Sequence, residues 1–416
     1  MKYLAVLGRQ PEISLAELSA LFPDAKQFSP NLALFSTDPA VASSPTSSKD
    51  SAGGPKTPSP VDISRLGGTI KIAEALPTSP LNYLASLPDG KITIGISDYS
   101  KGASKKTAVL EGLKLKKILV RHGRSVRVVE SKDAVLPTAT SLHNGLSGRK
   151  ERKVELIKVN DEWFKVIGVQ DIDAYARRDQ ARPARDARVG MLPPKLAQIL
   201  INLCGPLPEN ATILDPFCGT GVVLQEALLM GYHAYGTDLS ERMVEYSKKN
   251  LEWLIKETEK RSFEGPSERG SARMSAPSPW RRATATRPEK DPFSVSLGDA
   301  TTFQWQSPID AVACEGYLGK PMSMIPPEIK LKTEQQECST IVLGFLKNLS
   351  TQIKPGTPVV MAVPAWRREN GSYSRLDILD EIEKMGYNVN NKTREGLLYA
   401  RTEQIVARDI IILRKN

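Results

Sequence analysis

The sequence predicts an α/β fold built around a parallel sheet, and three observations favour it. From about Arg188 onward, apolar strand-like runs alternate with helical patterns, an order typical of parallel sheets with crossover helices. One strand leads into a turn with two glycines, in the stretch ILDPFCGTGVV (213–223). Three strands in this region end at or beside an acidic residue. These acidic strand ends predict where a ligand binds.

Length and composition limit the number of domains and the kinds of partner that this chain can have. At 416 residues the chain exceeds what one hydrophobic core usually supports, so two or three domains are expected. The net charge of +10 favours a polyanionic partner, although a solvated basic surface explains it equally well. Four widely spaced cysteines and three histidines indicate neither a disulfide framework nor a metal site. No apolar stretch has the length of a membrane span or the pattern of an export signal, so we expect a cytoplasmic protein.

The first part of the chain predicts a small α/β unit that closes near residue 90. Strands are expected at 2–7, at 32–36 and in GGTIKIAEAL, with a helix at 14–22. The stretch at about 37–60 is rich in Ser and Pro and lacks apolar periodicity, so it is predicted to be a disordered insertion.

Residues 91–172 predict a second α/β unit with a strongly basic face. A strand at 91–97, an amphipathic helix at 105–121 and a strand at 125–130 precede further strands. Between residues 101 and 132 there are ten Lys or Arg residues and two acidic ones, a balance that indicates a nucleic-acid contact. The candidate phosphate contacts are Lys105, Lys106, Arg121, Arg124 and Arg127.

The connector at 173–190 is also rich in arginine. Arg182 and Arg185 are candidate RNA contacts, and salt bridges to Asp179 and Asp186 are an equally good explanation of such arginines. The parallel sheet then occupies 191–416, with a leading helix at 193–204 and a hairpin at the end of the chain. A second insertion without apolar periodicity is expected at about 260–290.

The strand ends predict a nucleoside cofactor site. Asp215 ends an apolar strand, and Gly219 and Gly221 let the following backbone pass close to a ligand, where a Cβ would occupy its space. Asp238 ends the next strand and is placed to accept hydrogen bonds from two ribose hydroxyls. Asp299, at a third strand end, is a candidate acceptor for an adenine amino group.

These features also fit a nicotinamide dinucleotide fold, and the turn itself discriminates between the two cofactors. Leu224 stands where the G-x-G-x-x-G fingerprint has its third glycine, and Asp215 would repel a diphosphate. The same carboxylate can pair with the ammonium of an amino acid. S-adenosylmethionine has that ammonium, a ribose and no phosphate, so it is the favoured cofactor. Helix capping alone explains one such carboxylate more readily than three in order.

Several longer motifs carry a family resemblance. DPFCGTG, GTDLS and the preceding RDQARPARDARVGMLPPKLAQILINL (178–203) resemble the THUMP-domain tRNA guanine-N2-methyltransferases, of the archaeal type that acts on guanosine 10. LGGTIKIAEAL, GVQDIDAYARRD and LLYARTEQIVARDI are similar to the same family. DPFCGTG is shared by many amino-methyltransferases, whereas RPARDARVGMLPPK is much more specific.

The resemblance implies three domains and additional cofactor contacts. The domains are an N-terminal ferredoxin-like domain at 1–90, a THUMP RNA-binding domain at 91–172 and a Rossmann-like methyltransferase domain at 191–416. Met191 and Pro194 are implied to lie near the methionine end of the cofactor. The motif neighbours Phe217, Leu239 and Ala300 complete the expected cofactor contacts.

The resemblance also implies a catalytic loop after the fourth strand of the sheet. In the family this loop is Asp/Asn-Pro-Pro-Tyr, whose oxygen acceptors hold the target amine while the aromatic ring stacks on the base. This sequence has ACEGYLG instead. Tyr317 then stacks, and the acceptor is either Glu315 or Cys314; Glu315 is favoured because a thiol is a poor acceptor. Gly316 in place of proline is expected to loosen the loop.

The implied function is methylation of the exocyclic N2 amine of a guanosine in tRNA, at nucleotide 10, with S-adenosylmethionine as the methyl donor. The expected partner is tRNA, with no membrane and no metal. A monomer is expected, and the sequence is compatible with a partner subunit. The alternatives are an RNA-binding pseudoenzyme on the same scaffold, because the loop departs from the family pattern, and a DNA amino-methyltransferase.

Overall fold

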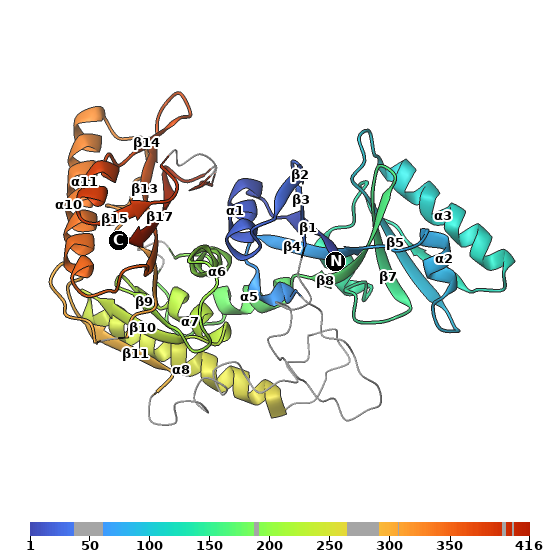
Figure 1. The fold of residues 1–416 in the computed structure, drawn as a ribbon, viewed down its shortest axis with the longest axis horizontal. Helices are drawn as coiled ribbons and strands as arrows, with labels where there is room; N and C mark the ends of the chain where they lie inside the picture. The colour runs from blue at the N-terminus through green and yellow to red at the C-terminus, as the bar shows by residue number, and fades with distance from the viewer. Residues whose placement is uncertain (37–60, 187–190, 264–290, 307, 393–396, 402) are drawn as a thin grey trace. The chain divides into compact units, whose positions relative to one another are not determined.

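A computed structural model describes residues 1–36, 61–186, 191–263, 291–306, 308–392, 397–401 and 403–416 (Figure 1). The described residues form two compact units. The first contains Met1–Leu15 and Phe22–Tyr175, and the second contains Ala16–Leu21 and the described residues from Ala176 onward. Both predicted insertions fall largely or wholly outside the described residues.

The first unit is built on one eight-stranded sheet with the strand order β2-β3-β1-β4-β8-β7-β5-β6. Its strands are β1 (Lys2–Leu7), β2 (Lys26–Ser29), β3 (Leu32–Ser36), β4 (Thr69–Ala75), β5 (Ile92–Asp98), β6 (Val126–Val129), β7 (Lys153–Val159) and β8 (Glu162–Val169). Only the β5–β6 and β5–β7 pairs are parallel. Because β4 pairs with β8, the sheet continues across residue 90, and the two predicted N-terminal domains share it.

The helices described before residue 181 are α1 (Pro11–Leu21), the 3-10 helix η1 (Ile63–Arg65), α2 (Pro80–Ala85), α3 (Lys105–Arg121), α4 (Thr138–His143) and α5 (Ile172–Gln180). Helices α1 and α5 each begin in the first unit and end in the second. Helix α3 begins at a capping box formed by Ser104 and Thr107. Leu115 and Leu119 of α3 join Ile94 of β5 in one apolar core, so one face of α3 is committed to the sheet and the other faces solvent.

The second unit contains a sheet with the order β11-β10-β9-β12-β13-β17-β15. Its strands are β9 (Thr212–Asp215), β10 (His233–Asp238), β11 (Phe293–Leu297), β12 (Ala311–Glu315), β13 (Pro358–Arg367), β14 (Tyr373–Arg375), β15 (Tyr387–Val389), β16 (Leu398–Tyr399) and β17 (Val406–Lys415). The strands from β11 to β13 are parallel, and β17 runs antiparallel to β13. The predicted parallel sheet and C-terminal hairpin are confirmed.

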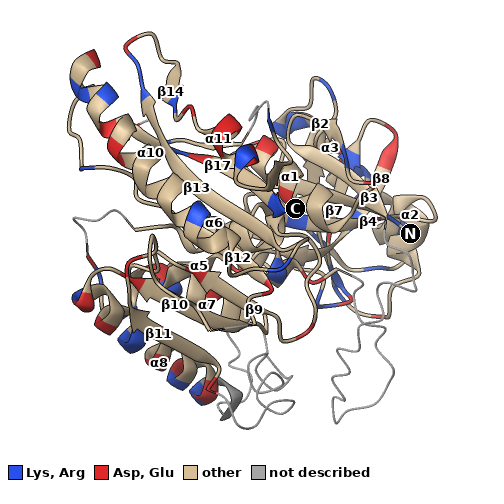
Figure 2. Ribbon diagram, turned by 60° about the vertical axis from the view of Figure 1, so that its left-hand side comes forward, with Lys and Arg blue, Asp and Glu red and all other residues tan. Residues whose placement is uncertain are grey.

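The helices of this unit are α6 (Pro194–Leu203), α7 (Val222–Leu229), α8 (Glu241–Phe263), α10 (Glu328–Ser350) and α11 (Leu379–Lys384). Figure 2 shows acidic and basic residues along α8, whereas α6 is almost wholly buried. Helix α10 supplies Val342, Phe345 and Leu346 to the apolar core beneath the sheet. Sequence patterns did not predict α10. In the part of the chain that the structure describes, no helix is long and apolar enough to cross a membrane.

Candidate active site at the carboxyl edge of the second sheet

Four acidic residues lie at the carboxyl ends of four neighbouring parallel strands. Asp215, Asp238 and Glu315 end β9, β10 and β12, and Asp299 follows the end of β11 by two residues. The chain runs outward from β9 to β10 and β11 on one side, and to β12 and β13 on the other. Ligands in open α/β sheets bind where the strand order reverses in this way, between β9 and β12. The sheet therefore brings the predicted acidic residues to the expected position.

The glycine turn after β9 has the backbone that only glycine adopts freely. Gly219 and Gly221 have φ angles of 51° and 81°. A Cβ on Gly221 would lie 2.8 Å from Oγ of Ser247. The Gly219 N–H donates to Asp238 at 2.8 Å, so the turn after β9 is joined to the end of β10. The turn therefore requires glycine-type backbone at both positions, and the predicted close approach of a ligand to them stays a prediction.

Helix α8 holds the same turn from behind through two fully buried side chains. The Ser247 hydroxyl donates to the carbonyl of Gly219 at 2.8 Å, and the Asn250 amide donates to the carbonyl of Thr220 at 2.9 Å. Asn250 also donates to the carbonyl of Ala184 and accepts from its N–H, each at 2.9 Å. One side chain thus joins the connector to the glycine turn. Sequence reasoning missed both residues.

The two central aspartates differ in exposure and in partners. Asp215 is buried and accepts from the Phe217 N–H at 3.1 Å. Burial raises the pKa of Asp215 well above its usual range, and the negative charges of Asp238 and Glu315 add to the rise. Asp238 is half-buried and accepts from the N–H groups of Gly219 and Ser240. A cation placed at this edge would be stabilised by Asp215 and would return its pKa toward the ordinary value.

The remaining predicted cofactor contacts lie around this pair. Asp299 is exposed and accepts from the N–H and the hydroxyl of Thr301, hydrogen bonds that lower its pKa. Leu239 is 74% exposed directly after Asp238. Phe217 lies edge-on to Phe345, with ring centroids 5.3 Å apart.

Three further contacts were predicted near these residues. Ala300 is buried. Pro194 is buried at the first turn of α6, and Met191 precedes that helix. No described contact joins Met191 to the strand ends, so its predicted role stays a prediction.

The predicted catalytic loop begins with a buried ion pair. Nε of Arg408, on β17, donates to Oε1 of Glu315. The side chain of Glu315 is 16% exposed, and that of Arg408 is 5% exposed. Burial raises the pKa of Glu315, and the Arg408 charge and hydrogen bond oppose the rise. Among the described residues, Arg408 is the one hydrogen-bond partner of the Glu315 side chain, so Oε2 remains available to accept.

The burial and hydrogen bonds of Cys314 and Gly316 bear on two other predictions for this loop. Cys314 is fully buried, and burial raises the pKa of its thiol well above the usual range, which disfavours it as the acceptor. Gly316 does not loosen the loop as expected, because its N–H donates to the Ala362 carbonyl at 2.9 Å and fastens the loop to β13. A proline there would lose this hydrogen bond. Tyr317 is half-buried against the core cluster that contains Trp366.

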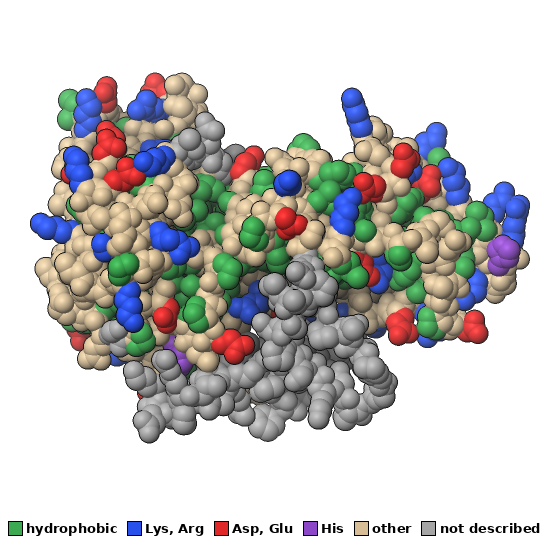
Figure 3. Space-filling model, in the orientation of Figure 1, with side chains coloured by type: hydrophobic (Ala, Val, Ile, Leu, Met, Phe, Trp, Pro, Cys, Tyr) green, Lys and Arg blue, Asp and Glu red, His purple; other side chains and the backbone are tan. Residues whose placement is uncertain are grey.

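The basic residues divide into exposed and committed side chains. Lys105, Lys106 and Arg121 are exposed on α3, and Figure 3 shows Lys and Arg side chains on the surface that α3 forms. Lys105 and Arg121 stand at opposite ends of the 17-residue helix, about 24 Å apart. Arg127 and Arg185 are also exposed. These five residues keep their predicted role as candidates for phosphate contacts.

Two predicted RNA contacts are corrected by the structure. Arg124 donates to the carbonyls of Leu87 and Pro88 at 2.9 and 2.7 Å, so its guanidinium closes the segment after α2. Arg182 is 2% exposed, so its guanidinium does not lie on the outer surface that an RNA phosphate would contact. Arginine usually lies at the surface, which explains why sequence alone placed both residues there.

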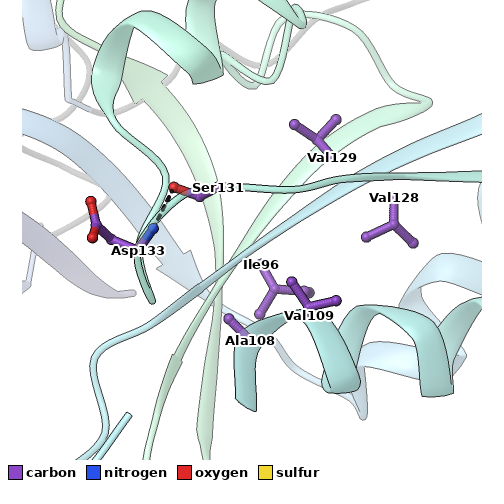
Figure 4. Close-up of a pocket in the computed structure, with 7 residues that line it drawn as sticks. All are labelled: Ile96, Ala108, Val109, Val128, Val129, Ser131 and Asp133. Carbon is purple, nitrogen blue, oxygen red and sulfur yellow. Dashed lines mark hydrogen bonds between the residues drawn. The ribbon is translucent and has the colours of Figure 1, made fainter. Parts of the chain in front are cut away.

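The first unit also contains a small cavity between β5, α3 and β6 (Figure 4). Its volume of about 10 Å³ suffices for no more than a water molecule. Ile, Ala and Val side chains line most of it, and Ser131 Oγ accepts from the Asp133 N–H at its mouth. This cavity is a packing gap and not a ligand site.

Residues 182–265 match the family described as the RMKL-like methyltransferase domain. This segment is similar to a methyltransferase. It includes the glycine turn, Asp238 and all of α8. The methyltransferase part of the predicted resemblance is therefore confirmed over residues 182–265.

Curated relatives also match parts of this chain, and the two described next are named as tRNA methyltransferases. The tRNA (guanine(10)-N2)-dimethyltransferase of Methanothermobacter thermautotrophicus is 46% identical over 76 residues, which cover 18% of this chain and 22% of that protein. The protein of the same name from Methanocaldococcus jannaschii is 28% identical over 158 residues, 37% of this chain and 44% of the relative. The chain therefore spans less than half the length of these curated relatives. Among solved structures, TrmN from Thermus thermophilus aligns over both complete chains with a TM-score of 0.43 and 17% identity.

Proposed function

We propose that this chain is an S-adenosylmethionine-dependent methyltransferase that methylates the exocyclic N2 amine of a guanosine in tRNA, at nucleotide 10. The observation that carries the proposal is the position of Glu315. Glu315 ends β12, beside the point where the strand order of the sheet reverses. The strand that neighbours β12 in the sheet, β9, leads into the glycine turn. The similarity of 182–265 to methyltransferases, and of shorter segments to the tRNA (guanine(10)-N2)-dimethyltransferases, supports the chemistry.

The cofactor edge fits S-adenosylmethionine better than a dinucleotide. A methyl group on Gly221 would meet Ser247, so glycine is required there for the turn to pack closely against α8. The carboxylates of Asp215, Asp238 and Asp299 fit an ammonium, two ribose hydroxyls and an adenine amine, and a diphosphate would be repelled. Leu239 and Leu297, exposed beside Asp238, offer apolar faces for the adenine ring. The bound cofactor supplies an electrophilic methyl group on its sulfonium.

Glu315 is the proposed hydrogen-bond acceptor for the target amine. Arg408 holds Oε1, which fixes the orientation of the carboxylate and leaves Oε2 for an amine hydrogen. Accepting that hydrogen directs the nitrogen lone pair away from conjugation with the ring and toward the methyl group. Tyr317, two residues further, provides the flat surface on which the base stacks. The hydrogen bond between Gly316 and Ala362 keeps this loop in place before the base arrives.

The first unit is proposed to hold the tRNA. Its sequence resemblance assigns residues 1–90 to a ferredoxin-like domain and 91–172 to a THUMP domain. Exposed cations on α3 support phosphate contacts. A base in a folded RNA must be extruded to reach a methyltransferase edge, so a separate surface for the RNA is expected.

Methylation of bulk tRNA with labelled S-adenosylmethionine, followed by nucleoside analysis, tests the function. We expect labelled N2-methylguanosine or its dimethyl form. Cofactor binding without any transfer to tRNA would favour the RNA-binding pseudoenzyme, in which the Glu315–Arg408 pair is only structural. Label in DNA amino groups instead would favour the DNA amino-methyltransferase.

A further inference from the structure

Arg182 is a buried arginine whose guanidinium is largely without partners. The residue is 2% exposed, and its Nε and Nη1 atoms make no hydrogen bond. Nη2 lies 3.1 Å from Sδ of Met191 and 3.5 Å from Oδ1 of Asp179. A thioether is a weak acceptor, and the Asp179 side chain is 45% exposed to water. In the part of the chain that the structure describes, the N–H groups on Nε and Nη1 therefore have no acceptor.

The carboxylates of this region are committed to other arginines. The carboxylate of Glu226, on α7, accepts hydrogen bonds from Nε and Nη2 of Arg178 at 2.6 and 3.2 Å. The carboxylate of Asp186 accepts a hydrogen bond from Nη2 of Arg242 at 2.6 Å. Arg182 thus keeps a positive charge for which no nearby carboxylate is fully available, and burial lowers its pKa. Buried charges of this kind are costly unless an anion compensates them.

The position of Arg182 is fixed relative to the glycine turn. Two residues after it, both backbone polar groups of Ala184 are hydrogen-bonded to the Asn250 side chain. The same side chain donates to Thr220 of the glycine turn. A single buried amide therefore joins the segment that carries Arg182 to the turn where the cofactor's amino-acid end is proposed to lie.

We propose that Arg182 binds the carboxylate of the methionine moiety of S-adenosylmethionine. The inference rests on the proposed cofactor and extends it to a residue that sequence reasoning had assigned to RNA. The amino-acid end of the cofactor carries one ammonium and one carboxylate. Asp215 pairs with the first and Arg182 with the second, so opposite buried charges recognise the two ends of one zwitterion.

Calorimetric titration of the full chain with S-adenosylmethionine and with decarboxylated S-adenosylmethionine tests this, because the two ligands differ only in the carboxylate. Wild-type protein should bind the complete cofactor about 10- to 100-fold more tightly. In Arg182→Met this preference should disappear, with the affinity for the decarboxylated ligand unchanged. Arg414→Met is the matched control, an exposed arginine paired with Pro358 at the opposite edge of the sheet, and should keep the preference.

The remaining outcomes are also decisive. The proposal would be overturned if Arg182→Met kept the preference for the complete cofactor, or if its affinities for both ligands fell by the same factor. Failure of the wild-type protein to bind either ligand would overturn the cofactor assignment itself. Thermal unfolding of ligand-free Arg182→Met should occur at or above the wild-type temperature, because a poorly compensated buried charge is removed. Arg182→Lys, which keeps a charge with fewer donors, should retain part of the preference. If Arg182→Met lowered only the affinity for tRNA, Arg182 would be assigned to RNA binding again and the proposal would be wrong.

Discussion

Each unit of this protein contains a buried ion pair, and the two pairs differ in how completely their atoms are used. In the first unit, Lys71 donates to Glu155, to the Leu136 carbonyl and to Ser141, while Glu155 also accepts from Ser97 and Ser141. Both side chains are at most 1% exposed. In the second unit, Arg408 holds one oxygen of Glu315, and the other oxygen has no hydrogen-bond partner among the described residues.

On the proposed function, this difference separates a structural pair from a catalytic one. The three donors of Lys71 are all used, so the pair closes the interior between β4, β5, β7 and α4 and has no capacity for a ligand. Glu315 lies at the carboxyl edge of a parallel sheet, where one acceptor atom remains available. We expect substitutions in the first pair to lower stability, and substitutions in the second to lower activity.

The largest expected effect is on the stability of the first unit. Glu155→Ala leaves Lys71 as an unpaired buried charge and should reduce the free energy of unfolding by about 3–5 kcal/mol. Denaturant titration monitored by far-UV circular dichroism measures this change. The double variant Lys71→Met/Glu155→Leu should recover part of the loss, because no charge remains buried. Cofactor affinity of the second unit should not change, and a change there would break the division between the two pairs.

The next effect concerns the cofactor edge. Asp238→Ala should weaken the binding of S-adenosylmethionine by about 1–3 kcal/mol, because two ribose hydrogen bonds are lost. Isothermal titration calorimetry measures the affinity. Asp310→Ala is a matched control, since Asp310 accepts from Thr212 at the amino end of β9, away from the carboxyl edge. Equal losses in the two variants would show that Asp238 acts only through the fold.

A pH profile sharpens the assignment of Glu315. Burial raises the pKa of Glu315, and Arg408 opposes the rise. Only the ionised carboxylate has both oxygens as acceptors, one for Arg408 and the other for the amine. Activity should therefore be lost as the pH falls through this pKa. Arg408→Met removes the opposing charge, so the acidic limb of the profile should move to higher pH. Arg375→Met, on β14, is the control, and an unshifted limb in Arg408→Met would separate Glu315 from the observed titration.

The smallest effects are expected on α3. Lys105→Ala and Lys106→Ala should each weaken tRNA binding only slightly and reduce the salt dependence of the affinity by about one unit of slope per lost phosphate contact. Filter binding at several salt concentrations measures the slope. Lys384→Ala, on the exposed face of α11, should leave the slope unchanged. If the α3 variants match this control, the RNA lies on another surface.

The sequence predicted those parts of the site that depend on local structure. Asp215, Asp238, Gly219 and Gly221 were identified because a strand end and a tight turn have local signatures. Arg408 and Asn250 were missed because their partners Glu315 and Ala184 are 93 and 66 residues away in the chain. Only the folded sheet and α8 bring them together.

Two other differences have physical causes. Helix α10 escaped prediction because its centre, Cys338–Gly344, contains β-branched residues and a glycine, which have weak helix propensity. Gly316 was expected to be mobile because glycine has a flexible backbone, but a hydrogen bond to a neighbouring strand overrides that property. Tertiary contacts decided both cases.

The single-turnover rate of methyl transfer to tRNA by Glu315→Gln and Glu315→Ala tests the central claim most directly. Glutamine keeps an oxygen acceptor and loses the charge, whereas alanine removes both, so the rate should fall in that order, by about 100-fold or more for alanine. Cofactor and tRNA affinities should stay near their wild-type values, because distant contacts set them. A Glu315→Ala rate equal to that of the wild type would contradict the claim and place the acceptor elsewhere in the loop.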